Sequence, residues 1–392
     1  MPNQAATKRF IDIVMISRLG VGDGGRETWI YNFMAEVSRQ QPDVAFRIFS
    51  LPLAPDNILV TTDIKQKVDV EHIEIPCVKT RVPLVLSFVR TFPAIYRQHR
   101  SARNTESVAV VGVGSLGEAL SVYLGSRGAP ASLERIMWLR TVFTREKFDR
   151  IPCILMSAIK FTEESLLNRA FDQIVANGDD TAAYYRERGV ECEVIHNAVR
   201  LAEYYGASRT PQGKLAVAFV GRLSDVKGTA EFLAAVRQAA NSGLLDQVEF
   251  HVAGAGPGQA QVQPLHEQGL LHYHGALSNR DMPGFLAQMD CCVALTSFTP
   301  SLGGGGVSNA LIEQMAARKI VVAWDNVIFR NALYDQEGYF VPQGDATALH
   351  QCFRYIVANP EEAQRKALTA SEGVKRYDIR HHVGKFFELL DA

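Results

Sequence analysis

Two positively charged side chains lie close together in one short loop of the second half of the chain. Arg222 and Lys227 stand in the sequence VGRLSDVKG (220–228), which follows an apolar run at 215–220 and precedes a helix-like run at 229–240. Arginine supplies a fork of hydrogen-bond donors and lysine a compact charge, so the pair suits the neutralisation of a phosphate group. The loop therefore predicts an anion site at the end of a strand.

A glycine-rich loop and a carboxylate follow in the same half. The sequence PSLGGGGVSNALIEQMA (300–316) places glycines at 303–306 before a helix-like run that contains Glu313. Bare amides and a helix N-terminus favour an anion, and the carboxylate could accept hydrogen bonds from ribose hydroxyls. Either loop alone also fits a flexible turn with solvated side chains, but the two together favour a site for a nucleoside diphosphate.

Composition excludes several classes of protein. The 392 residues are 47% hydrophobic and 21% charged, which is typical of globular proteins and leaves room for about two domains. A net charge of -1 removes the global argument for nucleic-acid binding. The six cysteines form no Cys-x-x-Cys pair, the polar N-terminus at 1–9 carries no apolar signal core, and no apolar run reaches the length of a membrane span, so we expect a cytoplasmic protein.

The elements that must position these loops alternate between strand-like and helix-like runs, which predicts an α/β fold. Apolar strand-like runs occur at 10–17, 44–50, 108–113, 135–139, 173–176, 193–195, 215–220, 248–253, 271–274, 291–295 and 320–323. A polar stretch at 200–213 contains glycines and a proline and is typical of a linker. We expect a doubly wound domain at 1–199, a second at 214–370, and a final helical segment at 371–392 that could pack back on the first.

Four motifs resemble those of retaining glycosyltransferases of family 4, which have the GT-B fold. They are VGRLSDVKG, VIHNAV (194–199), VAGAGPG (252–258) and PSLGGGGVSNALIEQMA. The resemblance covers the second half closely, whereas in the first half it rests on the first strand and on Gly24-Gly25. It implies two Rossmann-like domains that face each other across a cleft.

The resemblance also implies a function and the residues that carry it. The expected activity is a hexosyltransferase reaction that moves a sugar from a UDP- or GDP-linked donor to a hydroxyl of a glycan, lipid-linked or small-molecule acceptor. The second domain would hold the donor and the first the acceptor. The implied contacts are Arg222 and Lys227 to the diphosphate, Glu313 to the ribose, Gly305, Gly306, Val307, Ser308 and Asn309 along the phosphates and sugar, backbone near Gly254 and Leu277 to the base, and Gly24 and Gly25 over the diphosphate.

The implied mechanism is electrostatic and retains the configuration at the anomeric carbon. The leaving diphosphate would accept the proton of the acceptor hydroxyl while the two cations stabilise its charge. No metal and no other cofactor is required by this mechanism. Asp69-Val70-Glu71 has the spacing of a metal-binding carboxylate pair, but we interpret it as a solvated turn.

The chain departs from the family pattern at three places. Gly305 stands where the family usually has a glutamate that contacts the donor sugar, which puts the identity of the sugar in doubt. Arg140 follows the strand at 135–139, where the family often has a histidine that touches the donor sugar. Arg140 could take over part of that catalytic role or could be an ordinary surface residue. His196-Asn197-Ala198 replaces the family's Pro-Asn-Gly.

Two further segments have alternative explanations. Gly112 to Gly117 matches the dinucleotide fingerprint Gly-x-Gly-x-x-Gly, but it follows a late strand and lacks the acidic partner, so a tight turn is the better explanation. The stretch 79–103 is basic and apolar, which fits either a peripheral membrane contact or a helix with a solvated face. Rival functions are a nucleotide-sugar-binding protein without turnover, a nucleotide-sugar epimerase and a dinucleotide oxidoreductase.

Overall fold

The computed structural model describes most of the chain in separate stretches. These are residues 8–20, 25–61, 64–75, 88–100, 107–140, 142, 153–205, 213–299 and 306–391. The chain divides into two compact units, each built on one parallel sheet. Unit 1 comprises Met1–Asn197, Pro300–Gly306 and Ile379–Ala392, and unit 2 comprises Ala198–Thr299 and Val307–Asp378.

Unit 1 contains a seven-stranded sheet in the order β3-β2-β1-β4-β5-β6-β7, with every pair parallel. The strands are β1 (Arg9–Val14), β2 (Val44–Ser50), β3 (Val70–Glu74), β4 (Ser107–Gly114), β5 (Glu134–Leu139), β6 (Gln173–Ala176) and β7 (Glu193–Val194). All of β2 is buried, as are the last residues of β1, β4 and β5. Burial on both faces explains why these strands are continuous apolar runs.

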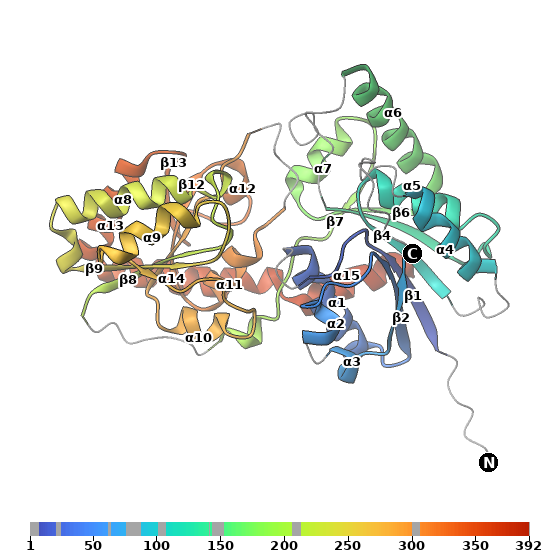
Figure 1. The fold of residues 1–392 in the computed structure, drawn as a ribbon, viewed down its shortest axis with the longest axis horizontal. Coiled ribbons are helices and arrows are strands. Elements are labelled where there is room, and N and C mark those ends of the chain that lie inside the picture. Colours follow the sequence, from blue (N-terminus) through green and yellow to red (C-terminus); the bar gives the residue numbers. More distant parts are fainter. Residues whose placement is uncertain are drawn as a thin grey trace, which may run out of the picture. The chain divides into compact units, whose positions relative to one another are not determined.

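The helices of unit 1 lie on both sides of its strands (Figure 1). They are α1 (Gly25–Gln40), α2 (Ile58–Thr61), α3 (Ile64–Lys67), α4 (Phe88–Arg100), α5 (Leu116–Gly125), α6 (Cys153–Ala170), α7 (Asp179–Arg186) and α15 (Ile379–Leu390). The last helix of the chain, α15, packs against α1. There the Trp29 indole N–H donates to His382 Nε2 at 2.8 Å, and Phe386 stacks on Trp138 with ring centroids 5.7 Å apart.

Unit 2 contains a six-stranded parallel sheet in the order β10-β9-β8-β11-β12-β13. The strands are β8 (Leu215–Val220), β9 (Val248–Ala253), β10 (His272–Tyr273), β11 (Cys291–Ala294), β12 (Ile320–Asp325) and β13 (Tyr339–Pro342). The helices are α8 (Thr229–Asn241), α9 (Gln259–Glu267), α10 (Met282–Ala287), α11 (Asn309–Ala316), α12 (Val327–Arg330), α13 (Ala346–Ala358) and α14 (Pro360–Gly373). The short 3-10 turns are η3 (Leu201–Glu203), η4 (Asp225–Lys227), η5 (Leu244–Asp246) and η6 (Val374–Tyr377).

The structure confirms the α/β prediction of two parallel sheets and corrects three details. The prediction that Asp69-Val70-Glu71 is a turn was wrong, because Val70 begins the edge strand β3. The strand β13 was missed altogether. Within the stretch interpreted as a linker, Leu201 and Tyr204 are buried in the core of unit 2, while residues 206–212 lie outside the described ranges.

Candidate functional site

The loop after β8 brings the two predicted cations to the carboxyl end of the sheet of unit 2. Arg222 is exposed, whereas the Lys227 ammonium donates to Thr296 Oγ1, 3.1 Å away, just beyond β11. Burial and the charge of Arg222 lower the pKa of Lys227. Because β8 and β11 are neighbours in the sheet, the cations lie where parallel sheets bind ligands.

Backbone geometry fixes this loop. The Ser297 amide donates to the Val226 carbonyl at 2.8 Å, so the loop after β8 is tied to the chain after β11. Gly228 adopts φ 74, and a Cβ atom there would lie 2.7 Å from the carbonyl oxygen of Leu295. A side chain is therefore excluded at Gly228 by both conformation and contact.

The predicted base-binding region lies at the same edge, after β9. The Gly254 amide donates to the Gly275 carbonyl at 2.7 Å, and a Cβ on Gly254 would lie 1.8 Å from the carbonyl oxygen of Gly221. Gly254 thus allows the loops after β8 and β9 to touch. Leu277 packs half-buried against the core of unit 2.

The N-terminus of α11 carries the next group of predicted residues. Val307 is buried in the core, and Ser308 is the N-cap residue but makes no capping hydrogen bond with its side chain. The Oδ1 atom of Asn309 is shielded from solvent and has no hydrogen-bond partner in the described part of the chain. Polar groups of this kind at a helix N-terminus can receive a ligand.

Glu313 lies in the second turn of α11 and is 9% exposed. The hydroxyl of Tyr204, in the turn after η3, donates a hydrogen bond to its carboxylate. Burial raises the pKa of Glu313 to about 7, the bond from Tyr204 opposes this shift, and the charge of Glu203 adds to it. The sequence did not point to Tyr204, because a tyrosine in a polar stretch carries no sign of its distant partner.

Two of the four glycines predicted to let the backbone approach the donor lie in the described part of the chain. Gly24 and Gly305 lie outside the described residues. Gly25 is the exposed first residue of α1. Gly306 belongs to unit 1 and adopts a φ of 61°. A Cβ atom on Gly306 would lie 2.3 Å from the carbonyl oxygen of Asn177.

Arg140 lies at the carboxyl end of β5 in unit 1. Its Cζ stands 4.7 Å from the centre of the Trp29 ring, and its Nη1 atom is shielded from solvent without a hydrogen-bond partner among described residues. Burial, aided by Arg26 and opposed by Glu27, lowers the pKa of Arg140 to about 9, so the guanidinium is charged at neutral pH. Arg140 is therefore not an ordinary solvated surface residue.

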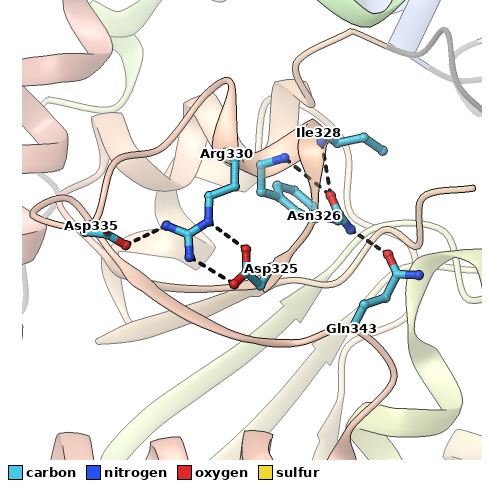
Figure 2. A network of polar contacts seen from close by, with 7 residues as sticks. Asp325, Asn326, Ile328, Arg330, Asp335 and Gln343 are labelled. Carbon is cyan, nitrogen blue, oxygen red and sulfur yellow. Dashed lines mark hydrogen bonds and ion pairs between the residues drawn. The ribbon is translucent and has the colours of Figure 1, made fainter.

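A polar network that the sequence did not reveal joins Asn326 to Gln343 (Figure 2). The Asn326 amide nitrogen donates to the Thr296 carbonyl at 3.0 Å and to Gln343 Oε1 at 2.8 Å, while its oxygen caps α12. Gln343 also accepts from the Phe298 amide at 2.8 Å. We call Asn326 and Gln343 the loop clamp, since together they fix the backbone of 296–298.

The stretch 79–103, for which a membrane contact is one explanation, is described only from Phe88 to Arg100. There Ile95 is buried, and a Cβ on Gly125 of α5 would lie 2.5 Å from it, so this face of α4 packs on α5. No helix in the described ranges has the length and apolar character to cross a membrane. Within those ranges, no three His, Cys, Asp or Glu side chains are placed to hold a metal ion.

Known proteins resemble this chain in sequence and in fold. Residues 214–359 match the family model of glycosyl transferases group 1. A phosphatidyl-myo-inositol mannosyltransferase of Mycobacterium leprae is 30% identical over 210 residues, which cover 53% of this chain and 52% of that protein. The chain spans about half the length of the curated relatives it matches.

Two solved structures resemble the fold of this chain over nearly its full length. The HepE protein of Anabaena in complex with UDP has a TM-score of 0.72 at 16% identity, over 98% of this chain and 99% of that one. Sucrose-phosphate synthase of Thermosynechococcus elongatus has a TM-score of 0.74 at 16% identity, over 98% of both chains. At such low identity the likeness concerns the fold. The chain has the GT-B fold, and its residues 214–359 match the family model of glycosyl transferases group 1.

Proposed function

We propose that this protein is a retaining glycosyltransferase that moves a hexosyl group from a nucleotide-diphosphate sugar to a hydroxyl of its acceptor. The observation that carries the proposal is the pairing of Arg222 with Lys227 at the carboxyl end of β8, with Lys227 held by Thr296. Two cations on a rigid loop of a group 1 domain suit a diphosphate better than a single anion. The UDP complex of HepE and its UDP-glucose complex support a nucleotide-sugar donor.

Each residue has a proposed role. Arg222 and Lys227 bind the diphosphate and stabilise its charge as the bond to the anomeric carbon breaks. Glu313 accepts hydrogen bonds from the ribose, and Ser308 and Asn309 contact the phosphates and the sugar. The acceptor hydroxyl loses its proton to the leaving diphosphate, so the reaction balances without a base from the protein and invokes no metal.

The base and the acceptor are proposed in broader terms. Backbone groups near Gly254 and Leu277 would contact uracil or guanine, and Gly24, Gly25, Gly305 and Gly306 would let backbone approach the donor. The acceptor is a glycan, a lipid-linked sugar or a small molecule, and a lipid-linked acceptor would suit a peripheral membrane contact through 79–103. The mannosyltransferase of Mycobacterium leprae, named for a phosphatidyl-inositol acceptor, supports the lipid class.

A second function has one specific observation in its favour. Gly305 stands where the family usually has a carboxylate for the donor sugar, so the protein could bind a nucleotide sugar without turning it over. The two functions share the diphosphate site and differ in chemistry.

The experiment separates binding from turnover. Calorimetry with UDP and GDP is followed by assays of transfer and donor hydrolysis over a panel of nucleotide sugars. We expect one nucleotide to bind with micromolar affinity. Lys227→Ala should weaken this affinity at least tenfold, whereas Arg237→Ala, which changes an exposed residue of α8, should leave it unchanged. Tight binding with no turnover of any donor would establish the binding protein instead, and equal binding by both variants would refute the site.

A further inference from the structure

Several polar side chains of unit 1 gather where the sheet connections reverse direction. The chain runs outward from β1 through β2 to β3 on one side, and from β4 through β5 to β7 on the other. The neighbours β1 and β4 therefore flank the topological switch point, where open parallel sheets bind ligands beyond their carboxyl ends.

Two buried carboxylates at this point accept hydrogen bonds from other residues of unit 1. Glu27 is 2% exposed and accepts from Ser17 Oγ at 2.6 Å. Glu118 is 5% exposed and accepts from the amides of Ile16 at 3.3 Å and Ser115 at 3.1 Å. Glu118 therefore accepts a hydrogen bond within unit 1 on each of its carboxylate oxygens, and Glu27 accepts one on a single oxygen.

Arg26 lies near both carboxylates but makes no hydrogen bond to either of them. Its guanidinium nitrogens lie 3.8 Å from Glu27 and 3.8 Å from Glu118, beyond hydrogen-bond distance, and a third of its side chain is exposed. The carboxylates thus hold Arg26 in place electrostatically while its N–H groups stay available.

Arg140 has no hydrogen-bonded carboxylate partner among the described residues, and the charge of Glu27 acts on it without a bond. It is stacked on Trp29, whose indole is fixed by His382, and its Nη1 lacks a hydrogen bond in the part of the chain that is described. A shielded, charged donor without an acceptor is costly and is explained when a ligand supplies the acceptor. Arg26 lies within electrostatic reach of Arg140, so two guanidinium groups act at this position beside the negative charge of Glu27.

We propose that Arg140, together with Arg26, binds a phosphate group of a ligand that occupies the switch point of unit 1. A phosphate offers several oxygens at once to two guanidinium groups, which a neutral hydroxyl cannot do. The inference deepens the proposed function and rests on it in one respect, since it makes the acceptor a phosphate-bearing molecule. The phosphate site itself stands on the residues of unit 1.

The test is phosphate binding in a full chain whose proposed donor loop is disabled. The protein used is the full chain with both Arg222→Gln and Lys227→Gln, and calorimetry is run on it with glycerol 3-phosphate, with glycerate and with glycerol. We expect saturable binding of glycerol 3-phosphate that weakens at least tenfold on Arg140→Gln and less on Arg140→Lys, which keeps the charge but loses the fork. Arg127→Gln, at an exposed arginine of unit 1 that bonds Tyr123, should leave this binding unchanged.

Several outcomes would overturn the inference. The first is that the Arg140 and Arg127 variants bind glycerol 3-phosphate equally well. The second is that glycerate or glycerol binds as tightly as glycerol 3-phosphate does. Circular dichroism and thermal unfolding establish whether each variant is folded. If Arg140→Gln does not fold, the binding measured for Arg140→Lys decides the test. Nucleotide binding by the unmodified chain is measured separately, so failure at Arg140 and failure of the proposed donor site are distinguished.

Discussion

The hydroxyl of Tyr204 donates a hydrogen bond to the carboxylate of Glu313, and both side chains are buried in unit 2. The two residues come from the turn after η3 and from α11. Burial raises the pKa of the carboxyl to about 7, and the bond from Tyr204 limits that rise. The residue proposed to contact the ribose therefore changes charge near neutral pH, and its partner tunes where this happens.

Glu313 should make the free energy of unfolding depend on pH. Its folded pKa of about 7 exceeds the ordinary value of 4.5, so the folded state favours the neutral acid. The resulting stabilisation is present below pH 4.5 and is lost as the pH rises through 7, in total on the order of 3 kcal/mol. Glu313→Gln should remove this loss, so the variant gains stability relative to the wild type between pH 5 and 8 in urea unfolding.

The matched control for Glu313 is Glu267→Gln, which changes an exposed carboxylate of α9 in the same unit. It should leave the pH dependence of unfolding unchanged. Parallel curves for Glu313→Gln and the wild type would show that Glu313 titrates as it does in the unfolded chain.

Tyr204→Phe should shift the pH dependence of donor binding upward. Ribose hydroxyls donate hydrogen bonds best to the ionised carboxylate, so affinity should rise as the pH passes about 7 in the wild type. Without the tyrosine hydroxyl the pKa of Glu313 rises, and the same gain needs a higher pH. The measurement is the dissociation constant of a nucleotide sugar from pH 6 to 9, because its diphosphate keeps its charge over this range.

A purely structural role for Tyr204 makes a different prediction. Loss of packing would weaken binding by the same factor at every pH. An unshifted profile with lower affinity would therefore contradict the proposed coupling between Tyr204 and Glu313.

The sequence predicted the sheets and the cations because both have local signatures. Continuous apolar runs mark buried parallel strands, and Arg222 and Lys227 occupy one loop. The edge strand at Val70–Glu74 was missed because it is short, and its half-exposed polar residues resemble a turn. The bond between Tyr204 and Glu313 and the loop clamp could not be predicted, since each joins residues that are distant in sequence and are brought together only by packing of the sheet.

One capping interaction could have been found. The spacing Ser115-x-x-Glu118 is that of a capping box, and the Ser115 amide indeed donates to Glu118. The glycine pattern at 112–117 does not reveal this carboxylate, which lies at the switch point of unit 1.

Gly228→Ala should destabilise unit 2 more than an ordinary glycine substitution. The left-handed conformation alone costs alanine roughly 1–2 kcal/mol. At Gly228 the new Cβ would also lie 2.5 Å from Leu295 Cβ and 2.7 Å from its carbonyl oxygen, which adds strain of about 1–3 kcal/mol. Gly243→Ala is the matched control, because φ there is 75 and no atom lies within 4 Å. Urea unfolding should rank Gly228→Ala below Gly243→Ala, and equal losses would contradict the close contact.

Asn326→Asp should weaken nucleotide binding without removing the cap of α12. The Asn326 oxygen accepts from the amides of Ile328 and Phe329, and an aspartate keeps this ability. The aspartate cannot donate to the Thr296 carbonyl or to Gln343, so the loop clamp opens next to the residue that holds Lys227. We expect a several-fold loss of UDP or GDP affinity by calorimetry, with the free energy of unfolding lowered by roughly 1–3 kcal/mol for the two hydrogen bonds lost.

The control for Asn326→Asp is Arg330→Ala, which changes a residue beside the loop clamp. Figure 2 shows Arg330 paired with Asp325, at 2.6 and 3.0 Å, and with Asp335, at 2.6 Å, beside the clamp. The Arg330 guanidinium donates to these two carboxylates and not to the loop clamp, so Arg330→Ala should keep the nucleotide affinity while losing little stability. If Arg330→Ala weakens nucleotide binding as much as Asn326→Asp, the effect belongs to the whole surface, and the loop clamp does not position Lys227.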